Sequence, residues 1–193
     1  MISAIILAAG QSIRMRQPKL LMPWGETKVI RRVVDSVMEG GIKDICVITG
    51  SLHNEIIKVL ADSPVRIQQN EDYANGEMLT SVQVGLHSLS DVSEAALIVL
   101  GDQPQIKPEV TREIIDRYQK THYPIIIPSY KMHRGHPWLV EKSMWPFILK
   151  LTRPDTLRTF LSISEDKIDY ITVNTPSILQ DLDTQEDYQH YKP

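Results

Sequence analysis

The chain has 193 residues and a formal net charge of -3, and 42% of its residues are hydrophobic and 23% charged. This length and composition are ordinary for a globular protein, so we expect a single domain spanning residues 1–193. Because the net charge is negative and Lys and Arg form no run, the electrostatic footprint of a nucleic-acid-binding protein is missing, and no nucleic-acid partner is expected.

The first ten residues, MISAIILAAG, are apolar, but they lack a basic flank and are too short to span a bilayer. They predict a buried strand rather than a signal peptide or membrane anchor, so no membrane partner is expected. Cys46 is the single cysteine and lies in an apolar run, which excludes an internal disulfide and a cysteine-based zinc cluster. These features together favour a cytoplasmic protein.

Short apolar runs alternate with amphipathic stretches through the first two thirds of the chain. Strands are predicted at residues 4–9, 44–49, 65–69, 95–100 and 124–128, and helices at 29–39, 53–61, 79–89 and 109–120. This alternation is typical of an α/β fold. Because apolar residues occupy consecutive strand positions, both sheet faces must be covered, which predicts a mostly parallel central sheet between helical layers.

Glycine and proline mark the ends of several predicted elements. Gly40 and Gly41 are expected to end the first helix, and Pro108 fits the first turn of the fourth. After Pro128 the rhythm changes to a helical stretch at residues 144–151, a second one starting near Pro154 and a final strand at 169–173. No Gly/Ser-rich linker separates this region, so we expect it to extend the sheet.

The segment after the first strand combines groups that suit an anionic ligand. In open α/β sheets, ligands bind beyond the carboxyl ends of strands. The small residue Gly10 lets backbone N–H groups approach a base or phosphate, while Arg14 could grip phosphate oxygens as a fork and Lys19 could act as a mobile charge. A solvated basic loop is the alternative interpretation. The segment is neither a P-loop nor a dinucleotide fingerprint, since GKS, GKT and GxGxxG are all missing from it.

A carboxylate follows the predicted strand at residues 95–100, in the tetrapeptide Gly101-Asp102-Gln103-Pro104. Mg²⁺ prefers oxygen ligands, often one or two carboxylates together with substrate phosphates, so Asp102 is a candidate ligand. A plain turn is the alternative, because Asp, Gly and Pro are all turn residues.

Residues 7–19, LAAGQSIRMRQPK, resemble the signature LAAGxSxRMGxPK of nucleotidyltransferases related to the molybdenum cofactor cytidylyltransferases and guanylyltransferases. The resemblance implies a Rossmann-like, three-layer nucleotidyltransferase fold whose loop wraps a nucleoside triphosphate. It assigns nucleotide binding to the matching positions, which are Leu7, Ala8, Ala9, Gly10, Ser12, Arg14 and Lys19. One position departs from the signature, since Arg16 stands where the family usually has glycine.

The same resemblance assigns the metal site. GDQP matches the family's metal-binding motif, so Asp102 becomes the first Mg²⁺ ligand, and residues 180–188, QDLDTQEDY, resemble the closing segment DxDTPED. Asp183 is preferred as the second ligand, although strand alternation would aim Asp181 to the same side. The alternative for Asp183 is a helix N-cap, with Glu186 three residues later.

Further matches concern substrate contacts. Ser81 matches the serine of a family segment that approaches the nucleotide, and the loop before it is a residue longer because Glu77 is inserted. On the acceptor side, Arg134 and His136 lie in an RGHP turn that leads into a strand, and a proton-transfer role for His136 is disfavoured, because a lone His before Pro is more often a turn or core residue. Asp155, Arg158 and Asp181 complete the residues assigned to the acceptor.

The resemblance implies that an acceptor phosphate attacks the α-phosphorus of the triphosphate, with Arg14, Lys19 and Asp102 as the catalytic residues and Mg²⁺ as the cofactor. Ala9 favours CTP over GTP, and molybdopterin is the implied acceptor, with a molybdenum hydroxylase or its maturation factor as a further partner. Two alternatives remain open at this point, a non-catalytic nucleotide-binding or cofactor-insertion protein and a sugar-phosphate nucleotidyltransferase.

Overall fold

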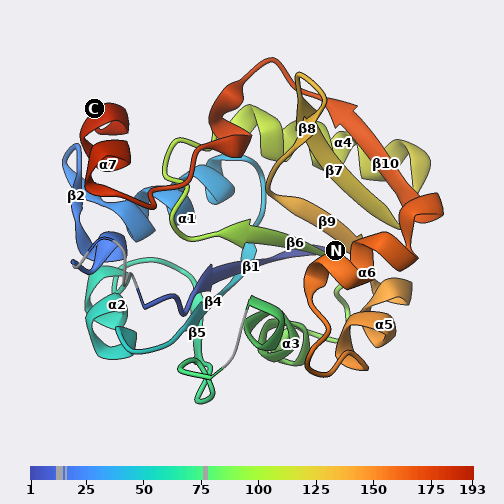
Figure 1. Ribbon diagram of the computed structural model, residues 1–193, viewed down its shortest axis with the longest axis horizontal. Helices are drawn as coiled ribbons and strands as arrows, with labels where there is room; N and C mark the ends of the chain where they lie inside the picture. Colours follow the sequence, from blue (N-terminus) through green and yellow to red (C-terminus); the bar gives the residue numbers. More distant parts are fainter. Residues whose placement is uncertain (12–14, 16, 76–77) are drawn as a thin grey trace.

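The computed structural model describes residues 1–11, 15, 17–75 and 78–193 of the chain (Figure 1). Within these residues, eight strands form one sheet in the order β10-β7-β9-β6-β1-β4-β5, with β8 paired to β7. The strands are β1 (Ile2–Ala8), β4 (Asp44–Thr49), β5 (Arg66–Gln69), β6 (Ala95–Leu100), β7 (Ile125–Tyr130), β8 (His133–Arg134), β9 (Trp138–Glu141) and β10 (Ile168–Thr172).

Most neighbouring strands of this sheet run parallel. β1 lies at its centre and pairs in parallel with β4 and β6, β4 continues to β5, and β10 pairs in parallel with β7. β9 runs antiparallel between β6 and β7 and so joins the two parallel blocks. The predicted α/β fold with a mostly parallel central sheet is confirmed, and β9 is the strand expected after the RGHP turn.

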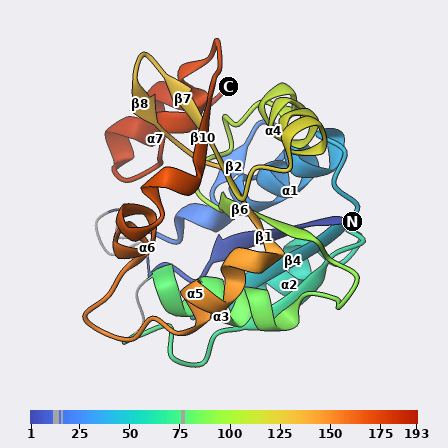
Figure 2. The same cartoon turned by 90° about the vertical axis from the view of Figure 1, so that its right-hand side faces the viewer.

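Helices cover both faces of the sheet (Figures 1 and 2). One layer holds α1 (Val29–Glu39), α2 (His53–Val59) and α4 (Pro108–Thr121), and the other holds α3 (Met78–Ser88), α5 (Trp145–Leu149) and α6 (Leu157–Ile163). Successive residues of β1 alternate between the layers, because Ala4 and Ile6 belong to the first core cluster and Ile5 to the second.

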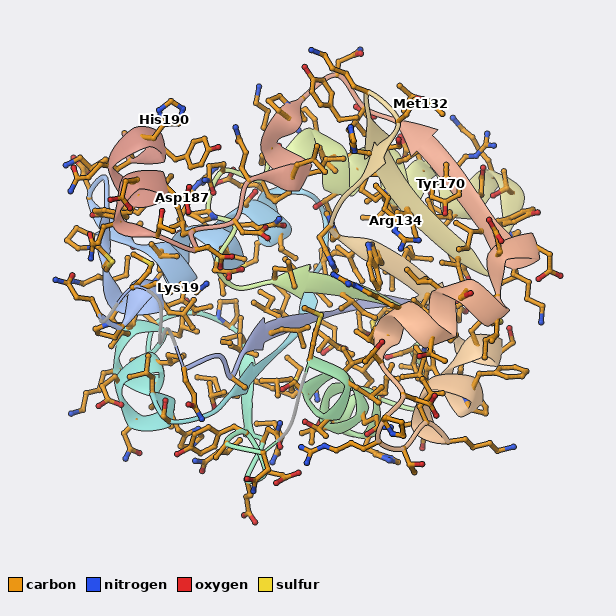
Figure 3. The ribbon with its side chains drawn as sticks, in the orientation of Figure 1. Lys19, Met132, Arg134, Tyr170, Asp187 and His190 are labelled. Carbon is orange, nitrogen blue, oxygen red and sulfur yellow. The ribbon has the colours of Figure 1, made fainter. Side chains whose placement is uncertain are left out.

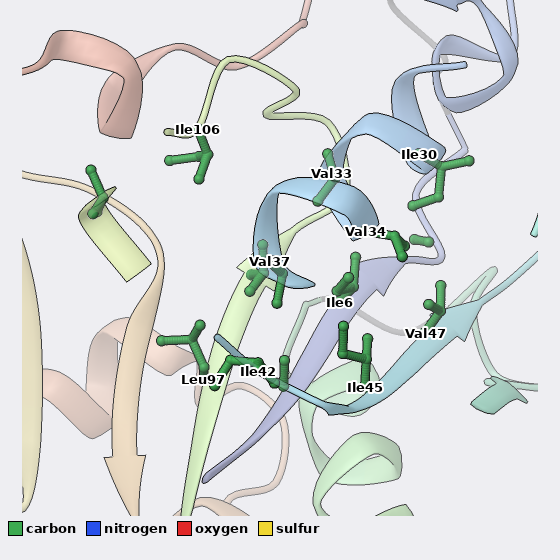
Figure 4. Close-up of a cluster of buried hydrophobic side chains, with 14 of the residues drawn as sticks. Ile6, Ile30, Val33, Val34, Val37, Ile42, Ile45, Val47, Leu97 and Ile106 are labelled. Carbon is green, nitrogen blue, oxygen red and sulfur yellow. The ribbon is translucent and has the colours of Figure 1, made fainter. Parts of the chain in front are cut away.

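The larger core cluster lies between α1 and the sheet (Figure 4). Val33, Val34 and Val37 of α1 are fully buried and meet Ile6 and Val47 of the strands. Burying each such side chain stabilises the fold by about 1.5–3 kcal/mol, which fixes both the helix face and the strand register. The apolar periodicity of the sequence therefore determines this part of the molecule.

Several predicted boundaries agree with the structure. α1 spans the predicted residues 29–39, Gly40 is its C-cap, and Gly41 adopts φ +103, which favours glycine. α4 begins at Pro108 as expected. α2 is two residues shorter than predicted and ends at Val59, because Leu60 leaves the helix as its C-cap.

Several short elements are not predicted by the sequence. One is a two-stranded sheet of β2 (Pro23–Trp24) and β3 (Thr27–Lys28). The others are the 3-10 helices η1 (Lys19–Leu21), η2 (Lys142–Met144), η3 (Glu165–Lys167) and η4 (Pro176–Leu179). These segments are too short for hydrophobic periodicity to reveal. The chain closes with α7 (Gln185–Tyr191). None of the described helices is long and apolar enough to cross a membrane.

Candidate active site

The carboxyl ends of β1, β4 and β6 meet at one edge of the sheet, where the backbones following them pack tightly. The N–H of Gly101 donates to the carbonyl of Leu7 at 2.9 Å. A Cβ added at Gly101 would lie 2.7 Å from that same oxygen, and one added at Gly50 would lie 2.7 Å from the carbonyl oxygen of Ala9. Glycine is therefore required at both positions by close approach of the backbone.

An ion triad stands at this edge. The Nζ of Lys19 donates to Oδ2 of Asp102 at 2.5 Å and to Oδ1 of Asp183 at 3.4 Å. Burial lowers the pKa of Lys19, but the carboxylates of Asp102 and then Asp183 outweigh this effect, so the pKa stands above its ordinary value. Lys19, which is labelled in Figure 3, is therefore a firmly charged ammonium group held between two carboxylates from distant parts of the chain.

Local packing brings the C-terminal segment to this edge. The N–H of Leu182, a fully buried residue, donates to the carbonyl of Asp102 at 3.1 Å. Further along, the hydroxyl of Tyr188 donates to the carbonyl of Pro23 at 2.6 Å, and its ring contacts that of Trp24. These contacts anchor the segment on both sides of Asp183, next to the η1 turn that carries Lys19.

A third carboxylate lies beside the triad. The side-chain amide of Gln103 donates to Oδ1 of Asp181 at 2.5 Å. Partial burial of the Asp181 carboxyl group, and after it the negative charge of Asp102, raises the pKa of Asp181, with Asp183 adding in the same direction. Asp181 therefore lies beside Asp102 and Asp183, the two aspartates predicted to bind the metal.

The N-cap of α7 is Thr184 and not Asp183, the residue that the sequence offers as an alternative cap. Thr184 is the N-cap, because its hydroxyl accepts from the N–H of Asp187 at 3.1 Å and the Asp187 carboxylate accepts from the N–H of Thr184 at 2.8 Å. The capping box is thus shifted by one residue from the pair Asp183 and Glu186. The carboxylate of Asp183 faces Lys19 instead.

Asp102 and Asp183 suit a magnesium or manganese ion. Their carboxylates already hold a positive charge between them, in the form of the Lys19 ammonium group. Across the described part of the chain, no group of three or more His, Cys, Asp or Glu side chains is placed to enclose a metal. Two carboxylates with the rest of the shell from phosphates and water is the usual arrangement for Mg²⁺, so the donor set fits.

The remaining positions that the sequence predicts to bind the nucleotide fall into three groups. Ser12 and Arg14 lie outside the described residues. Leu7, Ala8, Ala9 and Gly10 run from the end of β1 to the loop after it, where Ala8 is buried, Leu7 and Ala9 are half-buried and Gly10 is exposed. Ser81 is buried in α3, where its hydroxyl accepts from the side chain of Asn70 at 3.1 Å.

Of the residues assigned to the acceptor, Asp181 lies beside the ion triad, and the other four belong to residues 134–136 and 155–158. Arg134 is exposed on β8, beside Ser129 of β7, and Tyr170 of β10 lies on the other side of β7 (Figure 3). Asp155 precedes α6, and Arg158 is exposed in its first turn. Among the described residues, the side chains of Arg134, Asp155 and Arg158 make no hydrogen bond or ion pair with one another or with the triad.

His136 is half-buried beside the sheet. Its ring stacks on Trp138 with centroids 4.2 Å apart, and its Nδ1 is buried with no hydrogen-bond partner in the described structure. Burial lowers the pKa of His136 to about 4, so the ring is neutral at pH 7. This placement agrees with the interpretation of His136 as a turn or core residue.

Two structural residues were missed by sequence reasoning. Asn70 is buried, donates to the hydroxyls of Thr80 and Ser81, and accepts from the N–H of Asp72, so it organises the loop before α3. Gln103 ties the loop after β6 to Asp181. Both lie inside motifs that the sequence pointed to, but residue type alone did not show their partners.

The chain is similar in sequence to known nucleotidyltransferases over most of its length. Residues 4–168 match the model of the MobA-like NTP transferase domain. The molybdenum cofactor cytidylyltransferase of Escherichia coli is 28% identical over 189 residues, which cover 97% of this chain and 93% of that protein. A probable molybdenum cofactor guanylyltransferase of Natranaerobius thermophilus is 30% identical over 138 residues, covering 68% of this chain and 62% of that protein.

Solved structures agree on the fold. Rv0371c from Mycobacterium tuberculosis superimposes with a TM-score of 0.85 at 24% identity, covering 98% of this chain and 96% of that one. A further structure of Rv0371c is a complex with manganese, with a TM-score of 0.81. Since the family model spans most of the sequence, the chain belongs to the MobA-like NTP transferase family and is a nucleotidyltransferase.

Proposed function

We propose that this nucleotidyltransferase transfers CMP from CTP to the phosphate of a molybdopterin-type acceptor and releases pyrophosphate. The observation that carries the proposal is the ion triad of Lys19, Asp102 and Asp183 at the carboxyl edge of the sheet. The molybdenum cofactor cytidylyltransferase of Escherichia coli aligns with nearly the whole chain, which supports this acceptor class. Ala9 in LAAG favours CTP, with GTP as the second candidate.

The bond changes are those of an in-line displacement. An oxygen of the acceptor phosphate forms a bond to the α-phosphorus, and the bond from that phosphorus to the pyrophosphate oxygen breaks. Because a phosphate oxygen is already nucleophilic, no strong general base is needed, and His136, with a pKa of about 4, is a weak base. The enzyme contributes positioning and electrostatic stabilisation.

Asp102 and Asp183 would hold the divalent cation, which polarises phosphoryl oxygens when bound. Lys19 would then turn from the carboxylates to the phosphates, where its charge stabilises the departing pyrophosphate. Arg14 is proposed to assist it, on the match to the family signature alone. Arg134, His136, Asp155, Arg158 and Asp181 are proposed to line the acceptor side.

Replacement of one carboxylate tests the proposal. Asp102→Asn should lower Mg²⁺-dependent pyrophosphate release from CTP and a molybdopterin acceptor by on the order of 100-fold, because an amide holds a divalent cation poorly. Asp116→Asn, an exposed site on α4, is the matched control and should release pyrophosphate as the wild type does. Unchanged release from folded Asp102→Asn would contradict the site. A parallel assay with GTP, ATP and UTP tests the choice of CTP.

A further inference from the structure

A buried glutamine lies directly beside Asp102. Gln103 is 1% exposed, and its Nε2 donates to Oδ1 of Asp181 at 2.5 Å and to the carbonyl of Ile178 at 3.4 Å. An ionised carboxylate and a carbonyl can only accept hydrogen bonds, so the amino end of the amide must face them. The orientation of the Gln103 side chain is therefore fixed by its neighbours.

The other end of the same amide is not satisfied. Oε1 of Gln103 is buried and has no hydrogen-bond partner among the described residues. A buried acceptor without a donor costs free energy, which the fold avoids at most positions. An apolar side chain would fill this space without that cost. The specific gain from glutamine is the donor that it places on Asp181.

Asp181 needs such a donor to stay where it is. The carboxylates of Asp102 and Asp183 repel it, and its side chain is exposed enough to turn towards solvent. Besides the charge of Lys19, the hydrogen bond from Gln103 is the interaction that holds Asp181 near them. Since no three acidic side chains in the described structure form a joint metal cage, Asp181 would act on a cation through its charge rather than as a ligand.

We propose that Gln103 is a positioning residue of the active site, which holds the Asp181 carboxylate beside Asp102 so that Asp181 strengthens the attraction of the site for a divalent cation. This inference rests on the proposed metal site at Asp102 and Asp183. It adds two residues to those that influence the cation. Gln103 acts only through Asp181, and Asp181 acts only through the local electric potential.

The test is a double-mutant cycle on the full chain, with Mn²⁺ binding measured by calorimetry. Gln103→Met keeps the volume but removes the donor, and Asp181→Asn removes the charge. Each should weaken Mn²⁺ binding by about 10-fold, the usual effect of removing an outer-shell partner of a metal site. The double variant should bind Mn²⁺ as weakly as Asp181→Asn and no more weakly, because Gln103 has no route to the cation except Asp181.

Gln83→Met is the matched control. Gln83 of α3 also uses its amide to tether backbone, because it donates to the carbonyls of Ile148 in α5 and of Leu151 at 3.0 Å each. Its replacement should lower the thermal midpoint of unfolding and leave Mn²⁺ affinity unchanged. Gln103→Asn is the second variant, for the case that Gln103→Met folds poorly. It keeps the amide but shortens its reach by one methylene, so it should also weaken Mn²⁺ binding by about 10-fold.

Two results would overturn the inference. Equal Mn²⁺ affinities of wild type, Gln103→Met and Gln103→Asn would show that the glutamine only packs the loop, and additive losses in the double variant would show that it acts by another route. Failure of the proposed function gives a different result. The wild type would then bind no Mn²⁺, or Asp102→Asn would bind Mn²⁺ as tightly as the wild type does. That outcome removes the metal site and the inference with it.

Discussion

At the residue scale, Lys19 pairs with two carboxylates in the structure and is proposed to contact the phosphates of the bound nucleotide. In the structure its ammonium group neutralises Asp102 and Asp183, with side-chain exposures of 12%, 22% and 47% along the triad. The charge of a divalent cation would compete with this group for the same carboxylates. The sequence predicts Lys19 as a phosphate contact, whereas its position between the aspartates is a product of the fold.

Removal of the ammonium group should therefore favour metal binding and impair catalysis. In Lys19→Met without nucleotide, Mn²⁺ affinity should rise by about 10-fold, which corresponds to about 1.4 kcal/mol for partly exposed charges. Turnover should fall by on the order of 100-fold, because the departing pyrophosphate loses its counter-charge. Lys120→Met, an exposed site on α4, is the control. A lower Mn²⁺ affinity in Lys19→Met would contradict this account.

His136 predicts a pH dependence of stability. Its pKa is about 4 in the folded protein, below the usual value of 6.5, so only the unfolded chain takes up a proton between those values. Stability is therefore fully present above pH 6.5 and falls as the pH decreases towards 4, by about 1–2 kcal/mol at pH 5.

Urea unfolding of wild type and His136→Gln at pH 7.5 and pH 5 tests this sign. The variant lacks the titrating ring, so its stability should fall less between the two values than that of the wild type. Equal losses in both proteins would show that other groups produce the acid sensitivity.

At the element scale, the start of α7 shows why the local sequence did not determine which residue caps this helix. Asp183 and Thr184 are both good N-cap residues, and each has an acid three residues later, Glu186 and Asp187 respectively. Local propensity cannot choose between the two registers. The choice follows from burial of Leu182 and its hydrogen bond to Asp102, which direct Asp183 to Lys19 and leave Thr184 as the cap.

Loss of this cap should weaken the helix that anchors the segment. Thr184→Ala should reduce the free energy of unfolding by about 1 kcal/mol, because the N–H of Asp187 loses its acceptor, while Thr184→Ser should retain most of it. Chemical denaturation of the three proteins checks the order. A Thr184→Ala protein as stable as the wild type would show that tertiary contacts such as that of Tyr188 hold α7 without the cap.

At the scale of the whole molecule, close contacts join segments that are far apart in sequence. A Cβ added at Gly135, in the RGHP turn, would lie 2.1 Å from the carbonyl oxygen of Ile178, and the N–H of His136 donates to that same oxygen at 3.1 Å. The RGHP turn thus supports the segment that presents Asp181 and Asp183. This contact links the RGHP turn to the segment that carries Asp183 of the ion triad.

Gly135→Ala should accordingly affect stability and turnover together. Displacement of the Ile178 backbone should lower the free energy of unfolding by about 1–3 kcal/mol, and pyrophosphate release should also fall because the aspartates move. Gly10→Ala controls for the effect of an added methyl group on stability, since an added Cβ there has no atom within 4 Å among the described residues other than its chain neighbours. If Gly135→Ala unfolds like the wild type, the contact relaxes freely.

The sequence by itself determined the alternation of buried strands and amphipathic helices, because burial of apolar residues such as Ile6 and Val33 follows a period that neighbours along the chain reveal. It also indicated Lys19, Asp102 and Asp183, since the chemistry of nucleotidyl transfer is carried by residue type and motif. Only the tertiary structure decided how these groups meet. The antiparallel insertion of β9, the ion triad, the cap at Thr184 and the hydrogen bond from Gln103 to Asp181 all join segments whose contact depends on packing of the complete sheet.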